Sequence, residues 1–321
     1  MHPAPFAAFI GVLLALPALA QETRPFVDDL GREVEVPASP ERIVALHDSM
    51  LTLPLIELGI MPVATATRTA EDGTFYIRSG VEAFGVDLES SGIVPVGGRP
   101  VDYEAIASAA PDLIVTTEWQ GADLDRLSRI APTVLIEQEA ATIQEIYERL
   151  AALTGTEDRH AQLQRRYEAN IARLAAAMEG HDVCASMIQV FDGEIDARDD
   201  RGNFDRVMEA VGVSRPPIFE QLAPGERRRF SMELLPEFDC DLLFSFYWGN
   251  EGMTPADGWA HWDANAFPGW CDTLHACREG QIYVFSISDM AIGTYDALHA
   301  MTTALNLVLV GGNEIVPFEG R

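Results

Sequence analysis

The chain has 321 residues and a formal net charge of −28, from 50 acidic and 22 basic residues. Hydrophobic residues make up 48% of it, which is enough to build a buried core and argues against a disordered chain. So negative a protein is not expected to bind nucleic acid, because the phosphates would be repelled.

The first twenty residues have the pattern of a secretory signal peptide. An apolar run from Ile10 to Leu16 is followed by Ala18 and Ala20 in the Ala-x-Ala arrangement that signal peptidase cleaves. The run is shorter than the roughly 20 residues that span a bilayer. We therefore expect cleavage after Ala20 and a mature protein exported to the periplasm.

Export makes the cysteines candidates for disulfide bonds. Cys271 and Cys277 are close in sequence within a loop-like stretch, whereas Cys184 and Cys240 each open an apolar, strand-like run. We favour the pairs Cys184–Cys240 and Cys271–Cys277, with buried free thiols as the alternative. No cysteine or histidine spacing typical of a zinc site occurs.

Strand-like and helix-like segments alternate along the first half of the chain after residue 20. Two short strands within residues 26–36 flank a turn at Gly31. Further strands and helices are expected at residues 42–46, 51–58, 62–67, 102–109, 112–116, 122–130 and 132–136, with a loop over 68–99. This alternation predicts a mainly parallel sheet with helices on both faces.

A long alanine-rich helical region covers residues 142–179. Thr142 and Glu145 fit a capping box, and Gly155 is expected to divide the region into a short and a long helix. The long helix, about residues 156–179, would extend about 36 Å and could act as a strut between two lobes. The β/α pattern resumes at residues 186–191, 203–211, 241–246, 281–285 and 294–310.

The two halves share one short motif. Glu104 follows Asp102, and Glu233 follows Ser231, by the same two positions, and a strand-like run begins eight residues after each glutamate. Each glutamate falls in the first turn of an expected helix, where the helix dipole favours a carboxylate. The shared spacing indicates either a corresponding glutamate in two similar lobes or ordinary helix-end glutamates.

No motif of a dinucleotide-binding, phosphate-binding, serine-hydrolase or zinc-dependent enzyme occurs, so no enzymatic activity is expected. An exported α/β hydrolase is the distant alternative.

Arginines and aromatic residues gather instead in predicted loops, where ligands of α/β sheets bind. Arginine forks bind anionic oxygens, and aromatic faces cover apolar surfaces, although each such residue could also be solvated or packed. The candidate ligand-binding residues are Arg68, Tyr76, Arg78, Arg99, Trp119, Gln120, Arg227, Arg228, Arg229, Trp248 and Tyr295.

Six further stretches occur in a fixed order: DLGREV at 29–34, PERIVA at 40–45, VGGRPVDYE at 96–104, APDLIV at 110–115, IAPTV at 130–134 and GQIYV at 280–284. Together they resemble the periplasmic substrate-binding proteins of ABC importers for iron–siderophore complexes and cobalamin. The resemblance implies two Rossmann-like α/β lobes with mainly parallel sheets, joined by a long rigid helix and separated by a ligand cleft. The expected boundaries are 21–153 and 181–321 for the lobes and 154–180 for the helix.

The resemblance also implies roles for particular residues. Glu104 and Glu233 match glutamates that form salt bridges with arginines of the membrane permease. Arg99 matches a residue that contacts the iron-chelating oxygens in hydroxamate-siderophore binders. Met290 and Ile292 stand where those binders carry aromatics, which favours a ferric citrate, carboxylate or catecholate complex over a ferrichrome-type ligand, with Tyr295 as a candidate direct metal ligand.

The expected protein is therefore a periplasmic receptor that captures a ferric-siderophore complex and delivers it to an ABC importer. It needs no cofactor of its own, and Fe3+ would arrive inside a siderophore or citrate chelate. We expect a monomer. Cobalamin and haem are the alternative ligands within the same family.

Overall fold

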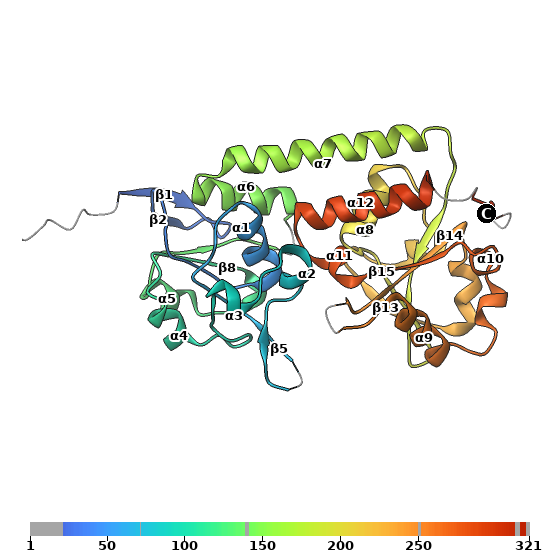
Figure 1. The fold of residues 1–321 in the computed structure, drawn as a ribbon, viewed down its shortest axis with the longest axis horizontal. Coiled ribbons are helices and arrows are strands. Elements are labelled where there is room, and N and C mark those ends of the chain that lie inside the picture. Colours follow the sequence, from blue (N-terminus) through green and yellow to red (C-terminus); the bar gives the residue numbers. More distant parts are fainter. Residues whose placement is uncertain (1–21, 71, 139–140, 250–251, 312–314, 319–321) are drawn as a thin grey trace, which may run out of the picture.

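The computed structural model describes residues 22–70, 72–138, 141–249, 252–311 and 315–318. The predicted signal peptide, residues 1–20, lies outside these described residues. Figure 1 shows two lobes side by side with one long helix, α7 (Glu157–Met178), running over both. The expected two-lobe α/β fold is confirmed.

Across the part of the chain that the structure describes, no helix is long and apolar enough to cross a membrane.

The first lobe is built on a five-stranded parallel sheet. Its strands, in spatial order, are β7 (Val94–Pro95), β4 (Ala64–Thr65), β3 (Ile43–Ala45), β8 (Leu113–Thr116) and β9 (Thr133–Leu135). Every residue of β3 and β8 is buried, as expected for central strands covered on both faces. The covering helices are α1 (Leu53–Glu57), α4 (Tyr103–Ser108), α5 (Leu124–Ser128) and α6 (Ile143–Thr154). An antiparallel pair, β1 (Thr23–Val27) and β2 (Glu33–Pro37), turns at Gly31 as predicted.

The segment expected as a loop over residues 68–99 contains short elements, so that prediction was wrong. They are the hairpin strands β5 (Arg68–Thr69) and β6 (Phe75–Tyr76), the helices α2 (Gly80–Phe84) and α3 (Leu88–Ser91), and the edge strand β7. Each has two to five residues, which is too short to produce a hydrophobic period in the sequence.

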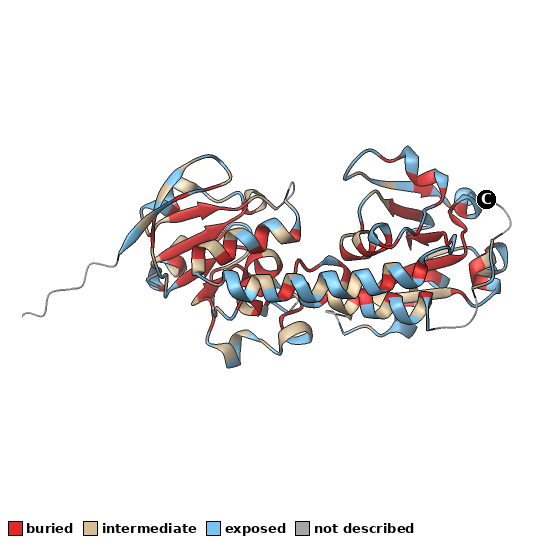
Figure 2. Ribbon diagram, turned by 90° about the horizontal axis from the view of Figure 1, so that it is seen from above, coloured by how far each residue is buried: buried red, intermediate tan, exposed pale blue. Residues whose placement is uncertain are grey.

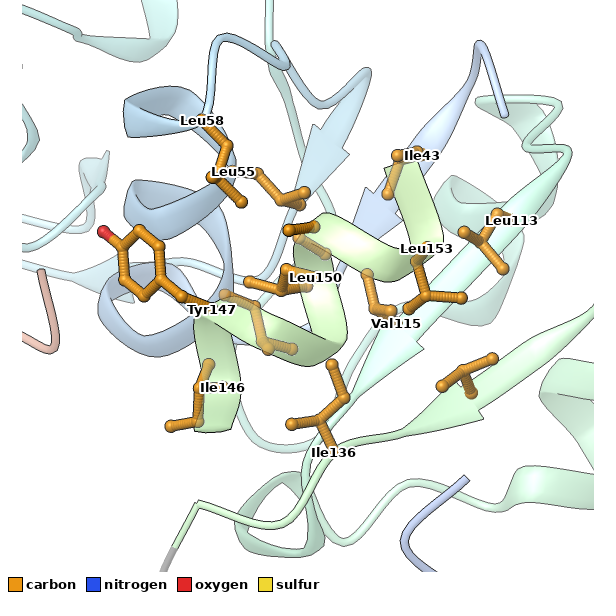
Figure 3. Packing of buried hydrophobic residues seen from close by; sticks show 14 of the residues in the cluster. Ile43, Leu55, Leu58, Leu113, Val115, Ile136, Ile146, Tyr147, Leu150 and Leu153 are labelled. Carbon is orange, nitrogen blue, oxygen red and sulfur yellow. The ribbon is translucent and has the colours of Figure 1, made fainter. Parts of the chain in front are cut away.

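Helix α6 packs one apolar face onto the first-lobe sheet. Thr142 and Glu145 form the predicted capping box, and Gly155 ends the helix with a φ of 70°. Figure 3 shows Leu150 and Leu153 of this helix on the side of the sheet residue Val115, and Tyr147 on the side of α1. Helix α7 then begins at Glu157, and Figure 2 shows it mostly exposed where it passes over the lobes.

The second lobe contains two three-stranded sheets. One is parallel: β10 (Ala185–Met187), β14 (Leu242–Tyr247) and β15 (Ile282–Ser286). The other is antiparallel: β11 (Gln189–Phe191), β12 (Glu194–Arg198) and β13 (Arg227–Ser231). The strand expected at 186–191 is therefore divided between two sheets. The remaining α-helices of this lobe are α8 (Asn203–Ala210), α9 (Pro255–Asn265), α10 (His275–Arg278), α11 (Ile287–Ala291) and α12 (Tyr295–Leu309).

Both predicted disulfide bonds are present. Cys184 is joined to Cys240 with a Cα–Cα distance of 5.5 Å, and Cys271 is joined to Cys277 with a Cα–Cα distance of 5.2 Å. The first holds the start of the parallel sheet of the second lobe, and the second closes a short loop beside α10.

Helix α12 belongs to the cores of both lobes. Tyr295 and Leu298 pack with the first-lobe cluster that includes Tyr147, whereas Met301 and Leu305 pack in the core of the second lobe. A helix buried in two cores limits how far the lobes can rotate apart, because any opening would expose apolar surface to water.

Candidate functional site

Three adjoining cavities follow the junction of the lobes. Those of about 300 Å³ and about 230 Å³ share Arg68, and the second shares Ile287 and Ala291 with a third of about 320 Å³. We call this continuous hollow the interlobe cleft. The first-lobe residues that line it follow the carboxyl ends of the parallel strands: Asp48 follows β3, Arg68 follows β4, Arg99 follows β7 and Trp119 follows β8.

Asp48 holds two arginines of the cleft in place. Its carboxylate accepts hydrogen bonds from Arg68 at 2.9 and 3.2 Å, and from the backbone N–H of Arg78 at 3.3 Å. Burial acts to raise the pKa of Asp48, but the hydrogen bond and charge of Arg68 outweigh it, so the pKa is lowered. The Arg78 guanidinium also donates to the Ser49 hydroxyl at 2.8 Å.

Trp119 forms an aromatic wall with charged neighbours. The guanidinium carbons of Arg99 and Arg68 lie 4.4 and 5.0 Å from its ring centroid, and the His47 ring lies 5.0 Å away. Burial lowers the pKa of His47 to about 4, and the charges of Arg68 and Arg78 act in the same direction, whereas Asp48 opposes them. His47 is therefore neutral at pH 7.

Beside Trp119 the backbone packs closely, and two buried side-chain oxygen atoms there have no hydrogen-bond partner among the described residues. A Cβ added at Gly98 would lie 2.9 Å from the Thr67 carbonyl oxygen, so this approach requires glycine. Gln120 donates from Nε2 to the Gly98 carbonyl, while the buried Gln120 Oε1 and Thr67 Oγ1 have no partner within the described residues.

The second-lobe wall combines aromatic and arginine side chains. The Trp248 ring packs edge-on against Phe191, Phe246 and His261, at centroid distances of 5.7, 5.3 and 5.2 Å. Beyond Trp248 the cleft continues along Arg227 and the buried Arg201. Trp248 therefore lines the middle part of the cleft, which shares Ile287 and Ala291 with the second-lobe end.

The structure brings most of the predicted ligand-binding residues together. Those that line the interlobe cleft are Arg68, Tyr76, Arg78, Arg99, Trp119, Gln120, Arg227 and Trp248. Arg228 instead pairs with Glu226 at 2.8 Å, and Arg229 donates to the Phe191 carbonyl at 3.1 Å. Successive side chains of β13 point to opposite faces, and for this reason Arg228 is turned away from its neighbour Arg227.

Tyr295 does not reach the cleft. It is 3% exposed at the start of α12, its hydroxyl lies 3.1 Å from His160 Nε2, and its ring packs on Tyr147 at 4.8 Å. Burial raises the pKa of Tyr295, with the charge of Glu168 adding to the effect. The structure therefore places it in the packing beneath α7 rather than where it could ligate a bound metal.

Sequence reasoning missed several cleft residues. His47 and Asp48 come two and three residues after the end of the buried strand β3, and a polar pair at that point was a usable signal. Arg198 and Arg201 carried no comparable signal. They lie at and after the end of β12, in the connection to α8, and the sequence did not predict that strand.

The paired glutamates occupy equivalent local positions on the surface. Asp102 Oδ1 accepts the backbone N–H of Glu104 at 2.9 Å, at the first turn of α4. Ser231 Oγ accepts the backbone N–H of Glu233 at 3.4 Å, at the start of a 3-10 helix (Met232–Phe238). Both glutamates are exposed.

Two larger hollows lie away from the cleft. One of about 710 Å³ lies beside β1 and α6, and one of about 600 Å³ lies beside α8; each is lined by more carboxylates than arginines. Within the described parts of the chain, no group of three histidine, cysteine or acidic side chains could hold a metal ion.

Comparison with known proteins places these features in context. The sequence model of the family described as periplasmic binding protein matches residues 86–284. Among curated relatives, the probable siderophore-binding lipoprotein YfiY of Bacillus subtilis is 24% identical over 82% of this chain and 80% of its own length. The iron(3+)-hydroxamate-binding protein FhuD of the same organism is 25% identical over 78% of this chain and 75% of its own length.

Solved structures share the architecture. Staphylococcus aureus SirA complexed with staphyloferrin B has a TM-score of 0.70, with 18% identity over 89% of this chain and 98% of that one. FhuD2 from the same organism with bound ferrioxamine B has a TM-score of 0.63, with 21% identity over 85% of this chain and 99% of that one. At this identity the likeness supports the two-lobe fold.

Proposed function

Because the chain belongs to the periplasmic binding protein family, we propose that it captures a ferric-siderophore complex outside the cytoplasm and delivers it to an ABC importer. Proteins of this family bind a ligand for transport and do not transform it. The relatives named for siderophore or iron(3+)-hydroxamate binding support this ligand class.

One observation carries the proposal: the interlobe cleft combines arginines with half-buried aromatic side chains. Arg99 and Arg68 lie beside Trp119 on one wall, and Trp248 lies on the other. A ferric chelate presents anionic oxygens around the metal and an organic rim outside them. Guanidinium groups match the oxygens, and aromatic rings cover the rim.

Delivery would use the exposed glutamates. Glu104 and Glu233 stand at the same local position in the two lobes, so they could meet equivalent arginines on a two-fold symmetric permease. Exposed charges of this kind set orientation and association rate more than affinity. We further propose that residues 1–20 are removed after Ala20 on export and that the mature protein is a monomer.

Titration of intrinsic tryptophan fluorescence tests the proposal, because Trp119 and Trp248 both line the cleft. The ligand panel contains a ferric hydroxamate, a ferric catecholate, ferric citrate, haem and cobalamin. Saturable quenching by a ferric chelate at submicromolar concentration is expected, with a smaller amplitude in Trp119→Phe. A response to haem or cobalamin without any response to the ferric chelates would overturn the ligand class.

A further inference from the structure

The second-lobe end of the cleft is a cavity of about 320 Å³ lined by three arginines. Arg198 ends β12, Arg227 begins β13, and Arg201 lies in the turn before α8. The side chain of Arg201 is only 4% exposed. Phe246 and Met290 form apolar walls of the same cavity. Three cations from three different chain segments thus converge on one partly apolar space.

Three aspartates lie near these arginines, but among the residues that line the cavity only Asp200 is acidic. Asp196 accepts hydrogen bonds from Arg227 at 2.8 and 3.2 Å and lies 3.7 Å from Arg201. Burial lowers the pKa of Arg201 to about 10, and the charges of Arg198 and Arg227 also act to lower it, against the opposing charges of Asp196 and Asp205. The side chains that line the cavity are therefore predominantly cationic, and a buried guanidinium is costly to keep out of water.

Two donors in this cluster lack partners. The buried Nε atoms of Arg198 and Arg201 make no hydrogen bond to any described residue. A buried donor without an acceptor costs free energy that an incoming acceptor can recover. A carboxylate or another anionic oxygen entering the cavity would supply both the missing acceptor and the missing charge.

The first lobe repeats the arrangement with different residues. Arg68 and Arg78 are held by the buried Asp48, and Arg99 forms no ion pair with a described residue. The middle part of the cleft, lined by Tyr76, Arg78, Trp248 and Ile287, connects the two clusters. Each lobe thus presents three arginines and a buried aspartate that is hydrogen-bonded to at least one of them, at opposite ends of one continuous hollow.

We infer that the ligand is an anionic ferric chelate with acidic groups at both ends, an inference that rests on the proposed function. Arg198, Arg201 and Arg227 form a separate anion subsite for one of these ends. A neutral trihydroxamate carries no acidic group that could supply an anionic acceptor to the second-lobe arginines. A cationic chelate would add repulsion at both ends of the cleft. The cleft thus selects an anionic ligand by charge, although the formal net charge of the whole chain is −28.

Equilibrium titration of the purified protein with ferric chelates of different charge tests this inference. The probes are ferric citrate and a ferric tris-catecholate, both anionic, a neutral ferrichrome-type trihydroxamate, and cationic ferrioxamine B. At least one anionic probe is expected to bind ten-fold or more tightly than the neutral and cationic probes, with a preference that weakens as salt is raised. Equal or tighter binding of a neutral or cationic probe would overturn the inference and leave the proposed function standing. Failure of every ferric probe would overturn the proposed function itself.

Two adjacent residues of β13 supply a matched pair of variants. Arg227→Gln removes a lining guanidinium, whereas Arg228→Gln removes a neighbour that pairs with Glu226 on the other face. With the best anionic probe, Arg227→Gln is expected to weaken binding at least ten-fold and Arg228→Gln less than two-fold. Equal losses would contradict the subsite. Arg227→Lys keeps the charge beside Asp196 and should bind with intermediate affinity, and thermal unfolding of each variant verifies that the fold is retained.

Discussion

The hydroxyl of Ser79 donates to the hydroxyl of Ser288 over 2.7 Å, in a buried hydrogen bond that joins the first lobe to α11 of the second. Both serines line the middle part of the interlobe cleft. The floor of the cleft is therefore a direct contact between lobes. A ligand bound in the cleft would therefore contact a surface that both lobes form together.

Breaking this contact should lower stability by a modest amount. Ser79→Ala and Ser288→Ala should each reduce the free energy of unfolding by about 1–2 kcal/mol, because each leaves a buried hydroxyl without its partner. The double variant should cost less than the sum of the two. A double-mutant cycle measured by urea unfolding tests the coupling, and strictly additive losses would show that the hydrogen bond contributes nothing.

Asp205 should make stability depend on pH in a defined window. Burial raises its pKa from 3.8 to about 6, although the Arg201 backbone N–H and the charge of Arg215 act to lower it. The folded protein therefore holds this proton more tightly than the unfolded chain. The resulting stabilisation is fully present below about pH 4 and is lost as the pH rises through about 6.

Asp205→Asn should remove this dependence. Relative to the wild type, the variant should gain stability between about pH 4 and 6, by roughly 3 kcal/mol at most, and then keep a constant difference at higher pH. Urea unfolding of both proteins at half-unit pH steps provides the measurement. Parallel stability profiles across this window would contradict the expected shift.

The paired glutamates should matter for uptake and not for ligand binding. Glu104→Ala together with Glu233→Ala is expected to leave the dissociation constant within two-fold of the wild type and to reduce transport in cells at least ten-fold. Glu157→Ala is the control, because Glu157 is also an exposed glutamate in the first turn of a helix. Normal transport by the double variant would rule out docking through these residues.

The two disulfide bonds should differ in their contribution to stability. They close loops with sequence separations of 56 for Cys184–Cys240 and 6 for Cys271–Cys277. The loop-entropy relation gives about 4 kcal/mol for the longer loop and about 2 kcal/mol for the shorter. Replacing each pair by alanines and measuring urea unfolding without reductant compares them. A larger loss from the shorter loop would show that packing, rather than loop entropy, determines the effect.

Much of the fold could be predicted because short stretches of sequence specify its strands and helix ends. Buried runs such as the one around Val115 mark central strands, and the Thr142–Glu145 capping box marks the start of α6. The antiparallel sheet of the second lobe was hidden, since three consecutive arginines at 227–229 suggest a charged loop rather than a strand. Pairing with β12 overrides that local preference.

The cleft could be predicted only in part. Arg99 and Trp119 follow strand ends, where the fold class itself directs side chains to the ligand. Whether Arg227 or Arg228 faces the cleft depends on the register of β13, and the sequence does not specify that register. Tyr295 was misplaced for a similar reason, because the direction in which the first turn of α12 faces is decided by its packing on Tyr147.

The double role of α12 affects the order in which the molecule can assemble. Residues 295 and 298 complete a core whose other buried members all lie before residue 164. The first lobe therefore remains without part of its interior until nearly the whole chain has emerged from the ribosome or crossed the membrane. Neither half should behave as an independent folding unit, and unfolding should proceed as one cooperative transition in which both lobes lose structure together.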